Sequence, residues 1–207
     1  MTAGVLLAAV LASAQSKRPE DLGVGKILVT PRDAPDPTFA ESVILLVHYD
    51  HESALGLMIN RRTTVPLSHA LRNLKAASRR TDLTYVGGPV ETDVAMALVR
   101  SGTKPDSASQ VLERIYLIPS RPALESELLG GKGADDLRVY VGYCGWGPGQ
   151  LDNEMRLGAW YVAEGNAGLV FDANPDTMWD RLIARSEARV ALARPRVRGA
   201  SLASAVR

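Results

Sequence analysis

The chain has 207 residues, of which 46% are hydrophobic and 23% charged, the composition of a globular protein rather than of a disordered, collagen-like or coiled-coil chain. The 24 Lys and Arg residues nearly balance the 23 Asp and Glu residues, and the net charge of +1 excludes a chain that binds polyanions along its whole length. One cysteine excludes an internal disulfide and a cysteine-rich zinc cluster, and the length predicts about one domain.

The first feature along the chain is a predicted export signal. Residues 5–12 are apolar, but a bilayer-spanning helix needs about 20 apolar residues, so we predict no membrane span. The small-x-small pattern Ala12-Ser13-Ala14 follows and is typical of a signal-peptidase site, although no Lys or Arg precedes the run. We therefore expect residues 1–14 to be a signal peptide, residues 15–24 a polar lead, and the protein to be periplasmic or secreted. The alternative is an apolar strand at an unprocessed N-terminus.

Three short apolar runs predict the first strands of the domain, at residues 26–30, 42–47 and 54–59. A short polar stretch joins the second run to the third, which predicts a β-hairpin. Gly56 lies inside the third run and indicates a bulge or a close approach of two backbones.

The rest of the domain alternates strands and helices without internal repeats. Leucines at i, i+4 and i+7 predict an amphipathic helix over residues 66–74. Further strands are predicted at residues 84–86, 94–99, 114–118, 137–144, 159–163 and 169–171, with a loop at 101–109 and helices at 121–129, 150–156 and 176–188. Because several strands are adjacent in the sequence, we predict one α+β domain over residues 25–187, with helices packed on a mixed or antiparallel sheet.

Residues 188–207 form a predicted basic tail. The segment contains no acidic residue, and its arginines are Arg189, Arg194, Arg196, Arg198 and Arg207. Such a charge is suited to binding nucleic acid or anionic lipid. The segment lacks a lysine cluster and interleaved aromatic residues, so a solvated, disordered tail is the favoured interpretation.

A glycine-rich turn over residues 145–149 separates a predicted strand from a predicted helix. Backbone N–H groups at such a turn can bind an anion, with help from the helix N-terminus. No Lys-Ser or Lys-Thr pair follows, so the turn is not a P-loop, and Pro148 removes one donor. The favoured interpretation is a tight turn whose glycines let Trp146 pack and whose Gln150 side chain binds the loop backbone.

The aromatic residues and the cysteine allow further hypotheses. The three tryptophans lie in the last third of the domain, where they line a pocket or, as we favour, pack in the core. Cys144 ends a predicted strand, where a hydrolase nucleophile could lie if one of the three histidines folded beside it. A small buried hydrophobic side chain is the favoured interpretation of Cys144.

A polar cluster on the predicted hairpin turn has the ligand types of a metal site. It consists of His48, Asp50, His51 and Glu52. Because a spacing of three within a loop is unspecific and turns are polar in any case, we assign no metal, and we assign no cofactor and no catalytic residue.

Three segments resemble the YqgE/AlgH family of bacterial proteins, also called UPF0301. They are residues 55–61 after an apolar strand, Gly87-Gly88-Pro89-Val90, and residues 142–151 (GYCGWGPGQL), the last accompanied by Glu154, Trp160, Phe171 and Trp179. The resemblance runs from about residue 25 to residue 185. It implies a branched sheet curled into a barrel-like shape and no firmly established activity. It also brings the label of transcriptional regulator, although the sequence shows no helix-turn-helix.

This chain departs from the family pattern at several positions. Tyr49 and Val99 stand where histidines are usual, Ser53 and Arg62 where Gly and Pro are usual, and Cys144 where Ala is usual. Any function that needs those histidines is therefore not expected here. Family members also usually lack an export-like leader, so a cytoplasmic location is the alternative to export.

The leading prediction is a non-enzymatic interaction or ligand-sensing domain whose partner is a protein or a small molecule. The predicted pocket residues are Asn60, Gly87, Gly88, Trp146, Gly147, Gly149, Gln150 and Glu154. One alternative is a transcriptional regulator that binds nucleic acid through the arginine tail. The other is a hydrolase that depends on Cys144.

Overall fold

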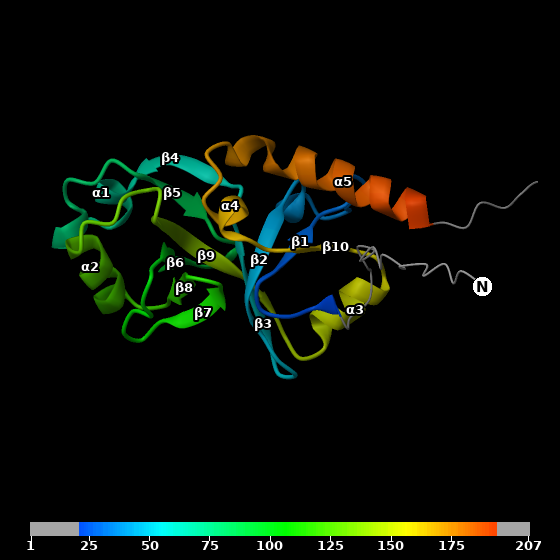
Figure 1. Cartoon of the computed structure of the whole chain (residues 1–207), viewed down its shortest axis with the longest axis horizontal. Coiled ribbons are helices and arrows are strands. Elements are labelled where there is room, and N and C mark those ends of the chain that lie inside the picture. Colours follow the sequence, from blue (N-terminus) through cyan, green and yellow to red (C-terminus); the bar gives the residue numbers. More distant parts are fainter. Residues whose placement is uncertain (1–20, 194–207) are drawn as a thin grey trace, which may run out of the picture.

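A branched β-sheet organises the part of the chain that the structure, a computed structural model, describes: residues 21–193 (Figure 1). Within that range ten strands form one sheet, in the order β10-β1-β2-β3-β9-β6-β8-β7, with β4 and β5 on a branch. The strands are β1 (Lys26–Val29), β2 (Val43–Tyr49), β3 (Ala54–Met58), β4 (Arg62–Pro66), β5 (Leu83–Val86), β6 (Val90–Arg100), β7 (Ser109–Leu112), β8 (Ile115–Ile118), β9 (Leu137–Trp146) and β10 (Tyr161–Glu164).

Helices cover the sheet on several sides (Figure 1). The α-helices are α1 (Leu67–Ala70), α2 (Arg121–Leu129), α3 (Gln150–Arg156), α4 (Ala167–Val170) and α5 (Met178–Ala193), and the 3-10 turns are η2 (Pro37–Phe39), η3 (Lys75–Ala77) and η4 (Pro175–Thr177). In Figure 1, α1 and α2 lie at one end of the molecule, and α3 and the long α5 lie at the other. None of the helices in the described range is long and apolar enough to cross a membrane.

Strand β9 is where the sheet branches. Along its first half, β9 pairs antiparallel with β6 and parallel with β5, and near its end it pairs antiparallel with β3, where Cys144 lies opposite Gly56. Both Val139 and Tyr140 are buried, so both faces of β9 are covered along its first half. The predicted α+β fold with a branched, curled sheet is confirmed.

Three hydrophobic clusters stabilise the fold. The largest lies between the sheet and α5, whose Trp179, Leu182 and Ile183 are buried. A second packs α1, η3 and α2 on β6, β8 and β9, and a third packs α3 on the opposite face of β1, β2 and β3. The third cluster carries the candidate site described below.

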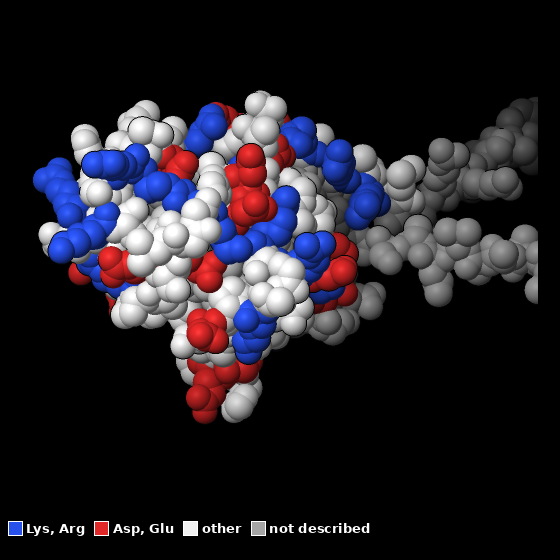
Figure 2. All heavy atoms as spheres, turned by 60° about the vertical axis from the view of Figure 1, so that its left-hand side comes forward, with Lys and Arg blue, Asp and Glu red and all other residues white. Residues whose placement is uncertain are grey.

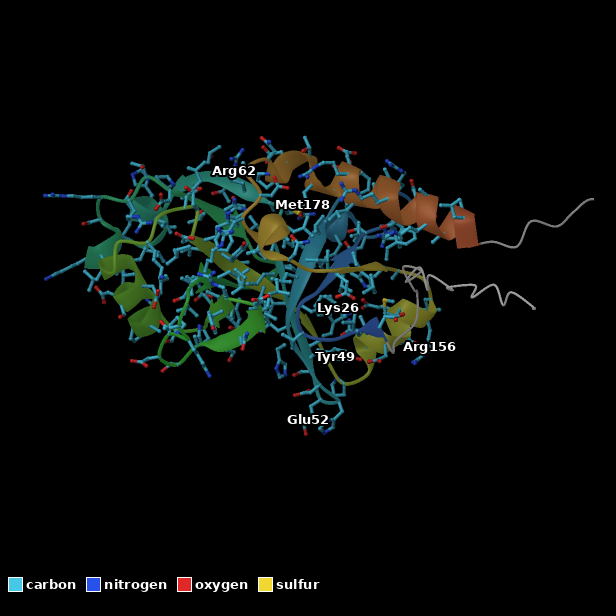
Figure 3. The ribbon with its side chains drawn as sticks, in the orientation of Figure 1. Lys26, Tyr49, Glu52, Arg62, Arg156 and Met178 are labelled. Carbon is cyan, nitrogen blue, oxygen red and sulfur yellow. The ribbon has the colours of Figure 1, made fainter. Side chains whose placement is uncertain are left out.

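The predicted hairpin is confirmed as the antiparallel pair β2 and β3, with a register shift between Leu46 and His48. Gly56 lies opposite Leu46, at the edge of this shift, as the predicted bulge requires, and a Cβ atom there would lie 2.4 Å from the side chain of Ile44. At the tip of the hairpin, Tyr49 points towards α3, and its hydroxyl donates to the Asp152 carboxylate at 2.9 Å (Figure 3).

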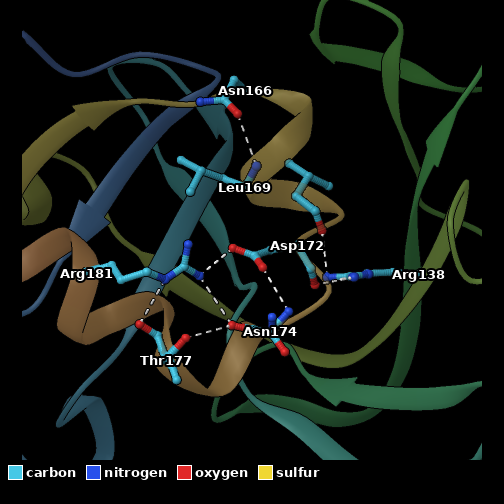
Figure 4. Close-up of polar contacts among 8 residues, drawn as sticks. Arg138, Asn166, Leu169, Asp172, Asn174, Thr177 and Arg181 are labelled. Carbon is cyan, nitrogen blue, oxygen red and sulfur yellow. Dashed lines mark hydrogen bonds and ion pairs between the residues drawn. The ribbon is translucent and has the colours of Figure 1, made fainter.

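Two predicted elements are wrong. The helix expected over residues 66–74 is only the four-residue α1, because Pro66 belongs to β4 and the chain turns at Leu71. The strand expected at residues 169–171 is the end of helix α4, whose first turn is capped by Asn166: its side chain accepts from the Leu169 N–H at 3.1 Å (Figure 4). Strands β4 and β7 were not predicted.

An arginine from β9 attaches α4 to the sheet. Arg138 is 8% exposed, and its guanidinium donates to the carbonyl oxygens of Val170 at 2.9 Å and Asp172 at 2.7 Å (Figure 4). The same guanidinium lies 5.0 Å from the ring centroid of Tyr85. Arg181 of α5 pairs with the Asp172 carboxylate and so joins α5 to the same loop.

Two predicted segments extend beyond the described residues. Helix α5 continues to Ala193, so the described fold reaches into the segment predicted as a basic tail; the remaining tail residues lie outside the described range. The predicted signal peptide, residues 1–14, also lies outside it.

Candidate binding site

A cavity of about 450 Å³ opens beside helix α3. Its walls come from the end of β9, from α3 and the turn that follows it, and from the loop between β1 and β2. The acidic and aromatic side chains of its lining are those of Asp33, Asp36, Phe39, Trp146, Glu154 and Trp160.

Glu154 fixes both tryptophans of the cavity. One of its carboxylate oxygens accepts from the indole Nε1 of Trp146 and from that of Trp160, each at 2.9 Å. Its other oxygen accepts from the Gln150 side-chain amide at 2.9 Å. The two indoles are 5% and 4% exposed, so the carboxylate satisfies two buried donors that would otherwise lack a partner.

The aromatic rings form a rigid wall. The Trp146 and Trp160 ring centroids are 6.3 Å apart at an interplanar angle of 80°, and Phe39 meets Trp160 at 5.8 Å and 82°. Edge-to-face packing of this kind stabilises aromatic pairs beyond the area that they bury. The hydrogen bonds and ring contacts together leave the wall little freedom to rearrange.

The local sequence explains how α3 presents these groups. Gly149 caps the start of α3 with φ of 67°, a left-handed conformation that glycine adopts readily. Gln150 and Glu154 are four residues apart and therefore share one face of the helix. The Gln150 side chain also accepts from the Gly147 N–H at 3.2 Å. This bond joins the glycine turn to α3, and the Gly147 N–H is therefore not free to bind an anion.

The structure brings together only part of the predicted pocket. Trp146, Gln150 and Glu154 line the cavity. Gly147 and Gly149 form the turn that leads into α3.

The other predicted pocket residues have backbone roles away from the cavity walls. Asn60 accepts from the Val43 N–H and donates to the Glu41 carbonyl, each at 2.9 Å. Gly87 and Gly88 lie against β9, where a Cβ atom on either would come within 2.1 Å of its backbone.

Sequence reasoning missed the loop after β1 as a wall of the cavity. The residues there are Asp33, Asp36 and Phe39, which follow or lie within a turn-like Pro- and Asp-rich stretch. That stretch indicates a turn but does not indicate that the turn folds over α3. Trp160 was singled out by the family resemblance, not by its position near Glu154.

Cys144 lies in the core behind the cavity. The residue is 1% exposed, its thiol lies 3.5 Å from the Gly87 carbonyl oxygen, and burial raises its pKa to about 12, against a smaller opposing effect of the Arg61 charge. A thiolate nucleophile is therefore strongly disfavoured at neutral pH.

The polar side chains of the hairpin turn make contacts within the turn. Asp50 accepts from the N–H groups of Glu52 and Ser53 at 2.8 and 2.9 Å, and these bonds hold its pKa below the usual range. His48 pairs with Asp50 at 3.0 Å. No group of three or more metal-binding side chains occurs within residues 21–193.

The cavity is acidic, while the opposite end of the molecule is basic. Among residues 21–193, its lining includes three carboxylates, those of Asp33, Asp36 and Glu154, and no Lys, Arg or His. Figure 2 turns the end that carries α1 and η3 forward and shows Lys and Arg gathered there. The charges of the two ends therefore favour different partners.

A family model described as AlgH-like matches residues 27–191 of the chain. A UPF0301 protein of Streptomyces avermitilis is 35% identical over 172 residues, covering 81% of this chain and 89% of that protein. A UPF0301 protein of Caulobacter vibrioides is 31% identical over 167 residues, covering 78% and 86%.

Two solved structures are similar to this fold. The solution structure of the AlgH protein from Pseudomonas aeruginosa has a TM-score of 0.66 and 27% sequence identity, covering 83% of this chain and 93% of that chain. A crystal structure of a protein from Corynebacterium diphtheriae has a TM-score of 0.67 and 21% identity, covering 79% and 87%, and this likeness shows the fold alone.

Proposed function

The chain belongs to the AlgH-like (UPF0301) family, and we propose that it is a non-enzymatic ligand-binding domain whose site is the cavity beside α3. One observation carries the proposal: the cavity has a wall of two tryptophans whose indole N–H groups are both held by Glu154. Concave sites with aromatic walls and a few fixed polar groups are the usual form of small-molecule sites.

Preorganisation supports binding at this wall. Each tryptophan has its polar atom bonded and its ring packed edge-to-face, so a ligand need not order these side chains when it enters. Binding loses less free energy when the groups that contact the ligand are already immobile. The cavity volume of about 450 Å³ lies within the usual range of small-molecule sites.

The arrangement of the side chains favours binding over covalent chemistry. The only cysteine, Cys144, is buried with its pKa raised, and it does not line the cavity. The Glu154 carboxylate accepts hydrogen bonds from three neutral donors, so its role is structural. Nucleophilic catalysis would need a nucleophile and a base within hydrogen-bond reach of each other in the cavity.

The test is a nitrogen-15 NMR titration of the full chain that follows the indole N–H signals of the three tryptophans. The probes are phenol, benzyl alcohol, benzylammonium and benzoate, which share a ring and differ in charge. We expect at least one probe to shift the Trp146 and Trp160 signals saturably. Trp179 packs in a different cluster and does not line the cavity, so its signal should move less, although its indole donates at 2.8 Å to the carbonyl of Thr30, which does line the cavity.

A pair of exposed leucines provides the matched control. Leu157 lines the cavity and is 78% exposed, whereas Leu129 is 74% exposed at the end of α2, far from α3 (Figure 1). Neither Leu157→Ala nor Leu129→Ala should change the melting temperature appreciably. Leu157→Ala should weaken probe binding and Leu129→Ala should not. Indole signals unmoved by all four probes, or equal effects of the two variants, would contradict the proposal.

We also propose that the protein is exported, from the apolar run and the Ala12-Ser13-Ala14 pattern. N-terminal sequencing of the protein from its native source should then begin at Gln15. A chain that still begins at Met1 or Thr2 in a cytosolic fraction would show that the leader is not cleaved.

A further inference from the structure

Resting on the proposed function, we propose that the ligand of the α3 cavity is an organic cation, a small apolar body that carries an ammonium or guanidinium group. The described side chains that line the cavity combine aromatic rings with carboxylates and include no positive charge. That combination distinguishes a cation from a neutral or anionic ligand of the same shape.

The carboxylates of the cavity form no ion pair with another described residue. Among residues 21–193, no Lys, Arg or His forms an ion pair with Asp33, Asp36 or Glu154. All the hydrogen-bond partners of Glu154 are neutral: two indoles and an amide. The negative charge at the cavity is therefore available to a ligand.

The one cation of the loop after β1 faces elsewhere. Arg32 precedes Asp33 directly, but its guanidinium bonds Glu187 of α5 at 3.1 Å and lies 5.2 Å from the ring centroid of Trp179. A loop that directs its arginine to α5 and its aspartates to the cavity separates the two charges. Asp36 accepts from the Thr38 N–H with one carboxylate oxygen, at 2.8 Å, so an incoming cation would meet Asp33 and Asp36 without displacing a charged partner from the described residues.

The aromatic wall adds a second attraction for a positive charge. The faces of tryptophan rings attract ammonium and guanidinium groups, and tryptophan is the strongest of the three aromatic side chains in this respect. Trp146 and Trp160 are only 5% and 4% exposed, so their rings add a smaller attraction than the carboxylates do. An anion would be repelled by the same groups.

The test compares benzylammonium with benzyl alcohol, which have nearly the same size and differ in charge at pH 7. Dissociation constants come from the shifts of the Trp146 and Trp160 indole signals in the full chain. Because a cation on an aromatic face and a nearby carboxylate both contribute, we expect benzylammonium to bind about tenfold more tightly. A difference of less than twofold would overturn the cation inference while leaving the binding proposal intact.

A charge-removing variant locates the source of the preference. Asp33→Asn/Asp36→Asn keeps the side-chain shapes, and Asn at position 36 keeps an oxygen for the Thr38 N–H that Asp36 accepts at 2.8 Å. The control, Asp106→Asn/Asp135→Asn, removes the same charge from two exposed residues outside the cavity.

The cavity variant should weaken benzylammonium severalfold and change benzyl alcohol by less than twofold, while the control changes neither. Equal effects of the two double variants on benzylammonium would overturn the inference, because only the overall charge would then matter. Failure of benzylammonium and benzyl alcohol with binding of phenol or benzoate would also overturn the inference, whereas failure of all four probes to move either indole signal would contradict the binding proposal itself.

Discussion

Replacement of Glu154 gives the sharpest test of the site, because one carboxylate holds two buried indoles. In Glu154→Ala, both indole N–H groups lose their acceptor, and each unpaired buried donor costs about 1–3 kcal/mol. Glu154 itself is half-buried, so water can replace part of the lost bonding. We therefore expect the free energy of unfolding to fall by about 2–4 kcal/mol, in the lower part of the summed range.

Glu154→Gln should be milder, because its amide oxygen can still accept from both tryptophans. Its NH₂ group would then face the Gln150 NH₂ group, which now donates at 2.9 Å, so one hydrogen bond is lost. If Gln150 rotated to accept, its NH₂ group would face the Gly147 N–H instead. The loss of one bond to a charged acceptor predicts about 1–2 kcal/mol.

Urea unfolding gives the order of stability, with wild type above Glu154→Gln and Glu154→Ala lowest. Glu113→Gln is the control, because Glu113 is exposed in the turn between β7 and β8. The indole signals of Trp146 and Trp160 should shift in both Glu154 variants and stay in place in the control. A wild-type urea midpoint for Glu154→Ala, with both indole signals unmoved, would refute the role assigned to Glu154.

Three further predictions concern the core and its pH dependence. Cys144, whose pKa is raised to about 12 by burial, should react with a thiol reagent at pH 8 only when urea unfolds the chain; fast reaction in the folded state would contradict its burial. Gly88→Ala should cost about 1–3 kcal/mol or more, because its Cβ would lie 2.1 Å from the β9 backbone, whereas Gly147→Ala, with no atom within 4 Å, should melt nearly as wild type. Burial alone would raise the pKa of Asp172, but hydrogen bonds, chiefly from Arg181, lower it. The folded pKa is thus below the unfolded one, so wild type should be more stable than Asp172→Asn at pH 7, and the difference should disappear as the pH falls below about 4; a difference that persists at pH 2 would contradict this.

The parts of the fold that could be predicted from the sequence are those with strong local signals. The hairpin of β2 and β3 follows from two apolar runs around a polar turn, and α2 occupies residues 121–129 as predicted. In each case, the residues that decide the structure lie within one short segment. Helix α3 is predicted with its bounds for the same reason.

The mistaken and missing elements are decided by contacts that sequence does not show. Residues 169–171 are apolar enough for a strand. The Asn166 cap and the hydrogen bond from Arg138 to the Val170 carbonyl favour a helix instead. The leucines at i, i+4 and i+7 after Pro66 are all buried as expected, yet the chain reaches that burial with one helical turn and a 3-10 turn. Burial could thus be predicted where helix length could not.

Sequence could predict only those residues of the candidate site that lie in one continuous segment. Trp146, Gln150 and Glu154 come from one continuous stretch, whereas Asp33 and Asp36 lie more than a hundred residues earlier in the sequence. Strand β1 carries their loop to the site, because it pairs with β10, which directly follows Trp160. Such a juxtaposition depends on sheet topology and not on any local pattern.

For the glycine-rich segment before α3, a structural role and a binding role are not alternatives. The residues that fix the turn, Gln150 and Glu154, are the ones that hold Trp146 against the cavity. A change that disturbs this network must alter stability and the shape of the wall together. A change to Asp33 or Leu157, both exposed, should remove only a contact with the proposed ligand and leave the network intact. Loss of binding without loss of stability is therefore the signature by which a ligand site can be separated from the packing that supports it.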